Sequence, residues 1–389
     1  MSKPKVLFYV QHLLGIGHLK RATTLARAMT DAGLQVTVVS GGEYVPVIDD
    51  SGMEFVQLPA IRAEDRTFKT LVNMKGAQLS DALKEKRRNK LLNLFNEICP
   101  EILMIELFPF GRRQLEFEVL PLLDTANGAD MRPIIVSSVR DILVEKNNSS
   151  READMVKKAK AYFDHILVHG DPNLIAFEET FPLASELRHM LHYTGYVVER
   201  ESFFHSQKKI GLGEVIVSSG SGAVGELLLR SALRIRKFTY LSEVKWRLLA
   251  GHYLPEEVFE SIRASADKGV MVERARPDFI SLLQNCRLSI SQGGYNTVME
   301  VLATGANGIA VPYAGGRETE QTLRVKLMEK RGLIRQIPEG QLSDKILIEA
   351  VNRTQNQTRN KKFKINMDGA IGSANLVATW AKELKDSYA

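Results

Sequence analysis

Short apolar runs alternate with longer amphipathic segments along the first half of the chain. The apolar runs predict strands at 5–10, 35–40, 54–59, 101–106, 133–138, 165–170 and 191–196. Short runs that are apolar on both faces are typical of a parallel sheet covered by helices on both sides. The segments between them, such as 19–32 and 81–99, have helical spacing. The pattern therefore predicts successive βαβ units.

The alternation stops in a polar segment at 197–213, which we interpret as a linker, and then resumes. The second series predicts strands at 214–219, 245–251, 269–273, 287–291 and 307–312. A chain of 389 residues is also too long for one ordinary core. We therefore predict an α/β protein with two doubly wound, Rossmann-like domains, at 1–196 and 214–372, facing each other across a cleft. A helix at 373–389 has apolar residues at helical spacing, and one option is that it packs back on the first domain.

Composition excludes several classes of protein. No run approaches the ~20 apolar residues of a membrane span, and the first apolar run is too brief for a signal peptide. Cys99 and Cys286 alone cannot form a disulfide framework or a cysteine metal cluster. No nucleic-acid-binding motif is present. We expect a cytoplasmic protein without a metal or a cofactor.

The net charge of +6 is partly local. Its most concentrated part is a run of cations on the predicted helix at 81–99, namely Lys84, Lys86, Arg87, Arg88 and Lys90. Such a patch suits an anionic membrane surface. A solvated helix face explains it equally simply. Both interpretations stay open, so membrane association is an option rather than a requirement.

The loop after the first predicted strand reads "QHLLGIGHLK" (11–20). A dinucleotide site needs a third small residue after Gly15 and Gly17, but Lys20 stands at that position. His18 then becomes the candidate for chemistry. A helix amino terminus disfavours imidazolium, and a neutral histidine can take a proton from a hydroxyl. Alternatively, His18 only caps its helix or packs.

Two further glycine-rich loops lie in the second half. In "VIVSSGSGAVGELLL" (215–229) free amides at a helix start would suit phosphate. In "SQGGYNTVMEVLATG" (291–305) the two glycines let the backbone approach a ligand, and Glu300 could accept two protons from a ribose diol. A buried or capping role for Glu300 is the alternative. Farther on, Glu320 and Gln321 suit sugar hydroxyls.

These three segments together resemble GT-B glycosyltransferases. The stretch from 291 to 321 is similar to the donor-nucleotide segment of family 28, which includes the lipid II-forming N-acetylglucosaminyltransferases. The loops at 12–29 and 218–223 resemble the family's G-x-G-H loop and the first loop of its second domain. The resemblance spans both halves in order, whereas about 60–130 matches nothing in the family.

The resemblance implies a role for each matching residue. Glu300 would hold the ribose, Arg276 would read uracil through its backbone, and Glu320 and Gln321 would face the donor sugar. His18 would be the catalytic histidine. The remaining nucleotide and diphosphate positions would be Gly17, Ser219, Gly220, Ser221, Gly222, Gln292, Gly293, Gly294 and Thr297. Asp141, after Arg140 at a strand end, would orient His18 or bind the acceptor; a plain strand end is the alternative.

The function expected is transfer of a sugar from a UDP-linked donor to an acceptor hydroxyl, with inversion and without a metal. His18 would act as the general base, and backbone amides would stabilise the leaving diphosphate. The donor sugar and the acceptor stay unassigned, with a lipid-linked acceptor as one option. A nucleotide-sugar epimerase or hydrolase on the same fold is the first alternative, and a non-catalytic nucleotide-sugar binding protein is the second.

Overall fold

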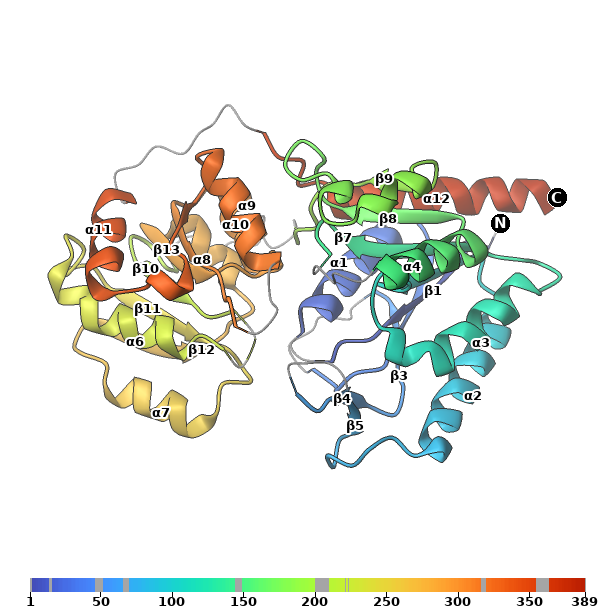
Figure 1. The fold of residues 1–389 in the computed structure, drawn as a ribbon, viewed down its shortest axis with the longest axis horizontal. Helices are drawn as coiled ribbons and strands as arrows, with labels where there is room; N and C mark the ends of the chain where they lie inside the picture. The colour runs from blue at the N-terminus through green and yellow to red at the C-terminus, as the bar shows by residue number, and fades with distance from the viewer. Residues whose placement is uncertain are drawn as a thin grey trace. The chain divides into compact units, whose positions relative to one another are not determined.

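The computed structural model describes residues 2–13, 16–45, 52–65, 70–143, 149–199, 210–220, 222, 224–315, 320–354 and 364–388. The chain divides into two compact units (Figure 1). Unit 1 comprises Met1–Val197 together with Asp368–Ala389, and unit 2 comprises Val198–Met367. Each unit is built on a parallel sheet, so the predicted α/β class is confirmed.

Unit 1 contains a seven-stranded sheet in the order β3-β2-β1-β6-β7-β8-β9. The strands are β1 (Lys5–Val10), β2 (Gln35–Ser40), β3 (Glu54–Gln57), β6 (Ile102–Glu106), β7 (Ile134–Arg140), β8 (His165–His169) and β9 (Leu191–Tyr193). Its helices are α1 (Gly17–Asp31), α2 (Asp81–Ile98), α3 (Glu116–Asn127), α4 (Ser149–Tyr162) and α12 (Gly369–Tyr388). A small antiparallel pair, β4 (Ile61–Ala63) and β5 (Leu71–Asn73), was not predicted.

Side chains alternate across this sheet, as a strand requires. Leu7 and Tyr9 of β1 face the core shared with α2, α3 and α4, whereas Val6, Phe8 and Val10 face the core shared with α1 and α12. Both faces are therefore covered. This explains why the strands are apolar throughout rather than alternating.

Unit 2 contains a six-stranded sheet in the order β12-β11-β10-β13-β14-β15. The strands are β10 (Val215–Ser218), β11 (Trp246–Ala250), β12 (Val270–Arg274), β13 (Leu288–Gln292), β14 (Gly308–Val311) and β15 (Arg335–Gln336). The helices are α6 (Glu226–Ile235), α7 (Glu256–Ala264), α8 (Phe279–Asn285), α9 (Tyr295–Thr304), α10 (Glu320–Lys330) and α11 (Asp344–Thr354). The predicted strands in this half are present, with shifts of a residue or two at their ends.

Helix α12 returns to unit 1 after the whole of unit 2 (Figure 1). It begins at Gly369 rather than at Ser373. A Cβ at Gly369 would lie 2.3 Å from the carbonyl oxygen of Gly195, so only glycine allows this approach. Farther along, Trp380 stacks on His165 of β8 with ring centroids 3.8 Å apart. The helix is thus an integral part of the unit 1 core.

The strand orders place a topological switch point in each unit. In unit 1 the order reverses between β1 and β6, and in unit 2 between β10 and β13. Ligands of open α/β sheets bind beyond the carboxyl ends of the strands at such points. The loops that follow β1 and β13 are two of the glycine-rich loops singled out in the sequence. The carboxyl ends of these strands are therefore the expected ligand-binding regions of the two sheets.

Candidate functional site

His18 lies at the switch point of unit 1, as the second residue of α1. Its Nδ1 is 2.9 Å from Oε1 of Glu106, the last residue of the neighbouring strand β6. Glu106 is 1% exposed and His18 15% exposed. Arg21, one turn farther along α1, contacts the same carboxylate oxygen. His18 is not the N-cap of the helix, since Ile16 holds that position, and no side-chain capping hydrogen bond is made there among the described residues.

A second set of hydrogen bonds reaches the other carboxylate oxygen of Glu106. The hydroxyl of Ser138 in β7 donates to Oε2 of Glu106 at 2.7 Å. Ser138 Oγ lies 2.9 Å from Nε2 of His169, and Nδ1 of His169 lies 3.0 Å from the hydroxyl of Thr194. All four side chains are buried. We call the set His18, Glu106, Ser138, His169 and Thr194 the relay.

The charges around the relay fix which groups carry protons. Burial raises the pKa of Glu106, but Arg21 and the hydrogen bond from His18 outweigh it, and the net pKa lies well below the usual range. Burial, together with the nearby Arg112 and Arg140, lowers the pKa of His18 to about 3. At neutral pH a carboxylate can only accept, so the neutral His18 donates its Nδ1 hydrogen to Glu106. The lone pair of His18 is then on Nε2.

The loop that leads into α1 is held by close backbone packing. A Cβ at Gly42, after β2, would lie 2.4 Å from the His12 ring, so glycine is required there. Arg112, which has a left-handed backbone with φ of 62°, donates from Nε to the carbonyl of Gln11 at 3.0 Å. Burial lowers the pKa of His12 to about 4. Both histidines of this loop are therefore neutral at physiological pH.

Asp141 does not orient His18. Its carboxylate is fully buried and accepts a hydrogen bond from the hydroxyl of Tyr196 at 3.0 Å. It packs under Gly170, where a Cβ would lie 2.6 Å from the Cβ of Asp141. The carboxylate that contacts Nδ1 of His18 is Glu106, at 2.9 Å, which sequence reasoning missed; the Arg21 guanidinium also lies 3.3 Å from this nitrogen. A carboxylate that ends the otherwise apolar run "ILMIE" was the available signal.

The two glycine-rich loops of unit 2 lie together. A Cβ at Gly220, whose φ of 70° suits glycine, would be 3.8 Å from the hydroxyl oxygen of Thr297 in α9. The hydroxyl of Ser219 is used inside the unit, since it donates to Leu249 O at 3.3 Å and accepts from Gly251 N–H at 3.0 Å. Gly222 belongs to the same loop, whereas Ser221 lies outside the described residues. The predicted phosphate loops thus lie together at the carboxyl ends of β10 and β13.

Helix α9 starts immediately after β13. Gln292 ends that strand and is 6% exposed, and a Cβ at Gly293 would lie 3.1 Å from the Cα of Pro312. Gly294 is the N-cap of α9, and nothing stands within 4 Å of a Cβ placed there. Amides at such a helix start are well suited to an anion. Glu300, in the same helix, is 5% exposed.

The two residues predicted to contact the donor sugar, Glu320 and Gln321, are held by contacts within unit 2. Glu320 is 3% exposed, and its Oε1 accepts from Arg324 at 2.7 Å. The Arg324 guanidinium carbon lies 5.1 Å from the centroid of the Tyr295 ring in α9. The Gln321 side-chain oxygen accepts from the backbone N–H of Tyr313 at 3.1 Å. Contact of Glu320 and Gln321 with a sugar stays a prediction.

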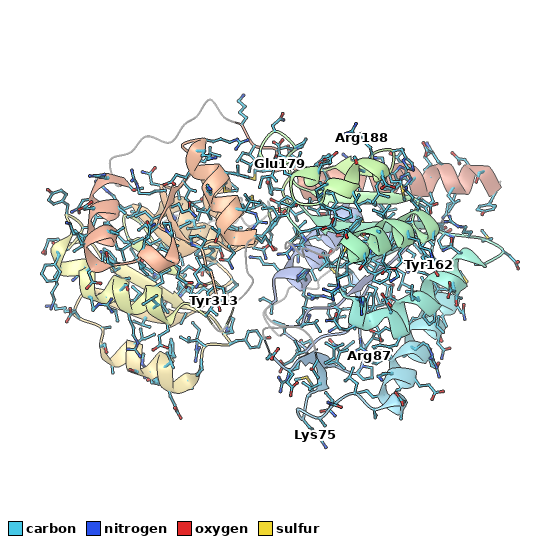
Figure 2. All side chains as sticks on the ribbon, in the orientation of Figure 1. Lys75, Arg87, Tyr162, Glu179, Arg188 and Tyr313 are labelled. Atoms are coloured by element: carbon cyan, nitrogen blue, oxygen red, sulfur yellow. The ribbon has the colours of Figure 1, made fainter. Side chains whose placement is uncertain are left out.

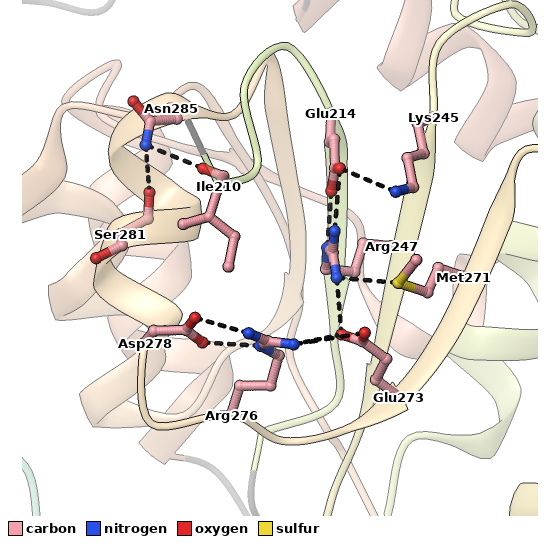
Figure 3. A network of polar contacts seen from close by, with 10 residues as sticks. All are labelled: Ile210, Glu214, Lys245, Arg247, Met271, Glu273, Arg276, Asp278, Ser281 and Asn285. Atoms are coloured by element: carbon pink, nitrogen blue, oxygen red, sulfur yellow. Dashed lines mark hydrogen bonds and ion pairs between the residues drawn. The ribbon is translucent and has the colours of Figure 1, made fainter. Parts of the chain in front are cut away.

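The side chain of Arg276 is clamped in a ladder of alternating charges (Figure 3). It donates to both oxygens of Asp278, at 2.8 and 2.7 Å, and lies 3.3 Å from Glu273. Arg247 continues the ladder, donating to Glu273 at 2.9 Å and to Glu214 at 2.7 Å. The clamp fixes the loop that follows β12, with the Arg276 side chain held by carboxylates.

Arg87 is not part of a basic surface. Its side chain, labelled in Figure 2, is fully buried and donates to both oxygens of Glu118 in α3 at 2.8 and 2.6 Å. Tyr9 also donates to Glu118, at 2.6 Å. A buried guanidinium with these partners cannot meet a membrane, so the predicted patch loses this residue. The other four cations of the run are half-buried or exposed.

The chain is similar to known proteins in both of its halves. Residues 225–379 match the Glycosyltransferase family 28 C-terminal domain. A protein from Sphingopyxis alaskensis is 26% identical over 329 residues, covering 82% of this chain and 75% of that protein. It is named UDP-N-acetylglucosamine--N-acetylmuramyl-(pentapeptide) pyrophosphoryl-undecaprenol N-acetylglucosamine transferase. A protein of the same name from Thermotoga neapolitana is 22% identical over 192 residues. That match covers 49% of this chain and 53% of the Thermotoga protein, about half of its length.

A solved structure covers nearly the whole chain. The calicheamicin glycosyltransferase CalG4 matches with a TM-score of 0.61 at 16% sequence identity, covering 99% of this chain and 98% of that one. At this identity the likeness defines the fold. Among the described residues, no helix is long and apolar enough to cross a membrane.

Proposed function

We propose that this chain, a glycosyltransferase of GT-B fold similar to family 28, transfers a sugar from a UDP-linked donor to an acceptor hydroxyl with His18 as the general base. The single observation that supports the base is the pairing of His18 with Glu106 at the switch point of unit 1. A neutral imidazole whose Nδ1–H is held by a carboxylate presents a basic Nε2. That is the arrangement required to remove a proton from a hydroxyl.

The reaction is proposed as a single displacement. As the acceptor oxygen bonds to the anomeric carbon, its proton passes to Nε2 of His18, and the bond between the anomeric carbon and the diphosphate oxygen breaks. Attack opposite the leaving group gives inversion. The amides at Gly293 and Gly294 would stabilise the departing diphosphate, as preorganised donors do for developing negative charge. The amide of Gly220 already donates to the Ser218 hydroxyl oxygen at 3.2 Å, so Gly220 would contribute by letting the diphosphate approach closely.

On the donor side, the proposal gives each predicted residue a position in unit 2. Glu300 would bind the ribose hydroxyls, and the backbone at Arg276 would contact the uracil. The clamp on the Arg276 side chain supports this, because it leaves the backbone of the loop as the group able to read a base. We propose that no metal is needed, since the sequence contains no Asp-x-Asp motif.

The first experiment identifies the donor. A thermal-shift screen of UDP-, GDP- and dTDP-sugars, starting with UDP-N-acetylglucosamine, needs no acceptor. A ligand present at 100 times its dissociation constant adds ~2.7 kcal/mol to the stability of the unit that binds it. Glu300→Ala should abolish the shift given by the uridine nucleotide. An undiminished shift would refute the ribose assignment.

The second experiment tests the base. His18→Ala should lower UDP release by ~10²–10⁴-fold while UDP still binds. His189, an exposed histidine of the same unit, supplies the control His189→Ala, which should turn over normally. Full turnover by His18→Ala would overturn the base assignment.

Two alternatives are separated by product analysis with the UDP-sugar alone. Release of free sugar or of an epimer at full rate without any acceptor would favour a hydrolase or an epimerase. Binding without turnover under all conditions would favour a nucleotide-sugar binding protein. Dependence of UDP release on an added acceptor favours transfer.

We propose a lipid-linked acceptor at a membrane surface, in line with the pyrophosphoryl-undecaprenol in the names of both relatives. The contact would use Lys84, Lys86, Arg88 and Lys90 of α2. Co-sedimentation with anionic vesicles tests it: Lys86→Glu combined with Lys90→Glu should release the protein into the supernatant. Unchanged sedimentation of this variant would exclude the α2 contact.

A further inference from the structure

We propose that His169 is a positioning residue for the general base, acting through Ser138 and Glu106. The inference rests on the proposed role of His18. It concerns a second, fully buried histidine, which touches Ser138 and Thr194 through its two ring nitrogens. His169 keeps the Glu106 carboxylate in the orientation in which it accepts the Nδ1 hydrogen of His18, and so fixes the direction of the His18 ring.

The sheet register brings these groups to one face. Glu106 of β6 is level with Ser138 of β7, and Arg140 of β7 is level with His169 of β8. Because side chains two residues apart share a face, Glu106, Ser138 and His169 all point to the side covered by α1. The three strands adjoin one another, so these three members of the relay are held by the sheet rather than by a loop.

The direction of every hydrogen in the relay follows from Glu106. An ionised carboxylate only accepts, so Ser138 must donate its hydrogen to Oε2. The Ser138 oxygen then accepts from Nε2–H of His169, which leaves Nδ1 of His169 as an acceptor for the Thr194 hydroxyl at 3.0 Å. The other acceptors near that hydroxyl, the carbonyls of Val168 and Gly195, are farther away, at 3.5 and 3.4 Å. With this tautomer, all hydrogens point toward Glu106. Burial lowers the pKa of His169 to about 3, which keeps a single ring hydrogen.

The opposite tautomer would weaken the base. If Nδ1 of His169 carried the hydrogen, the Nε2 lone pair would compete with Glu106 for the Ser138 hydroxyl. Oε2 would then lose its hydrogen bond, and only Oε1 would hold the carboxylate, through His18 and Arg21. Hydrogen bonds to charged groups are among the strong ones, so this loss should reach the His18 ring.

The chain offers a conservative variant and a matched control. Glutamine places an amide NH₂ near the position of Nε2, so His169→Gln keeps a donor toward Ser138, whereas His169→Leu removes it. Ser138→Ala removes the next link. Ser137 is as deeply buried as Ser138, but its hydroxyl donates to Phe108 O at 2.8 Å on the other face of β7. Ser137→Ala is therefore the control.

The test uses the full chain with ¹⁵N-labelled histidine, whose ring shifts report the tautomer. We expect His169 as the Nε2–H form and His18 as the Nδ1–H form in the wild-type protein. In His169→Leu and Ser138→Ala, the His18 signal should move toward mixed tautomers, and kcat for UDP release should fall about ten- to hundred-fold. KM for the donor should not change. His169→Gln should restore most of kcat, and Ser137→Ala should match the wild type.

Three results would overturn the inference. They are an Nδ1–H form of His169 in the wild-type protein, an unchanged His18 signal in folded His169→Leu, or equal losses in His169→Gln and His169→Leu. Each is distinct from failure of the base assignment, which is read from His18→Ala alone. Loss of activity in His18→Ala with normal turnover in His169→Leu would retain the base and reject the positioning role.

Discussion

Acidification should destabilise unit 1 because three of its buried histidines are neutral in the folded state. The pKa values of His12, His18 and His169 are lowered to about 4, 3 and 3, chiefly by burial. In the unfolded chain each has its ordinary value of 6.5. Between pH 6.5 and the lowered values, the unfolded state therefore binds protons that the folded state does not. Stability is lost as the pH falls through this window and is not affected above it.

The size of the effect follows from the shifts. Each pH unit below 6.5 costs about 1.36 kcal/mol per histidine that stays neutral in the fold. At pH 5, this amounts to about 2 kcal/mol for each of the three. His165 and His192, whose pKa values burial also lowers, act in the same direction. A loss of this size is a large part of the stability of an ordinary domain.

The measurement can be confined to one unit. The chain has two tryptophans, Trp380 in unit 1 and Trp246 in unit 2. In a Trp246→Phe background, urea unfolding followed by fluorescence reports on unit 1 between pH 7.5 and 5. His169→Gln removes one titrating group and should reduce the acid loss by about 2 kcal/mol. Thr194→Val disturbs the same place but keeps the imidazole, so its acid loss should equal that of the parent. If His169→Gln loses as much stability on acidification as the parent, then His169 already binds protons in the fold and the reasoning fails.

Three further predictions concern buried contacts. Glu118→Gln leaves Arg87 in the core facing an amide and should destabilise unit 1 by about 3–5 kcal/mol, measured by the same Trp380 unfolding curve; a change below 1 kcal/mol would contradict the buried pair. Gly369→Ala forces a Cβ against Gly195 O and should lower the melting temperature of unit 1 while Trp246 reports an unchanged unit 2; equal effects on both would show that α12 is not docked this way. Arg247→Met breaks the ladder beside Glu214 and should do the reverse, destabilising unit 2 alone; a normal Trp246 transition would refute the ladder's contribution.

Most of the fold could be predicted because apolar runs report burial directly. The strands of both sheets are confirmed, and residues 225–379 match the Glycosyltransferase family 28 C-terminal domain, in line with the predicted resemblance. The partner of His18 could not be predicted, since Glu106 lies far along the chain and meets it only because β6 adjoins β1. Asp141 was chosen by a similar strand-end argument. The structure places its carboxylate under Gly170 and against Tyr196 instead.

The run of cations on α2 illustrates a second limit. The charge of the run predicted a surface position for all of its cations. The position of Arg87 around the helix axis turns its side chain inward, where Glu118 of α3 is its partner. Charge alone cannot distinguish a solvated guanidinium from a buried, paired one. The acid that decides the matter is about thirty residues away in another helix, as its contact with Arg87 shows.

The return of α12 to unit 1 has a consequence for biosynthesis. The face of the first sheet that carries Val6, Phe8 and Val10 is completed by Ala374, Val377 and Trp380. During translation those early strands leave the ribosome long before this second part of their cover exists, and all of unit 2 is made in between. Unit 2 is contiguous and can fold first, whereas this face of unit 1 is covered only in part, by α1, until α12 has been synthesised. A nascent chain halted before Asp368 should therefore expose that face to chaperones.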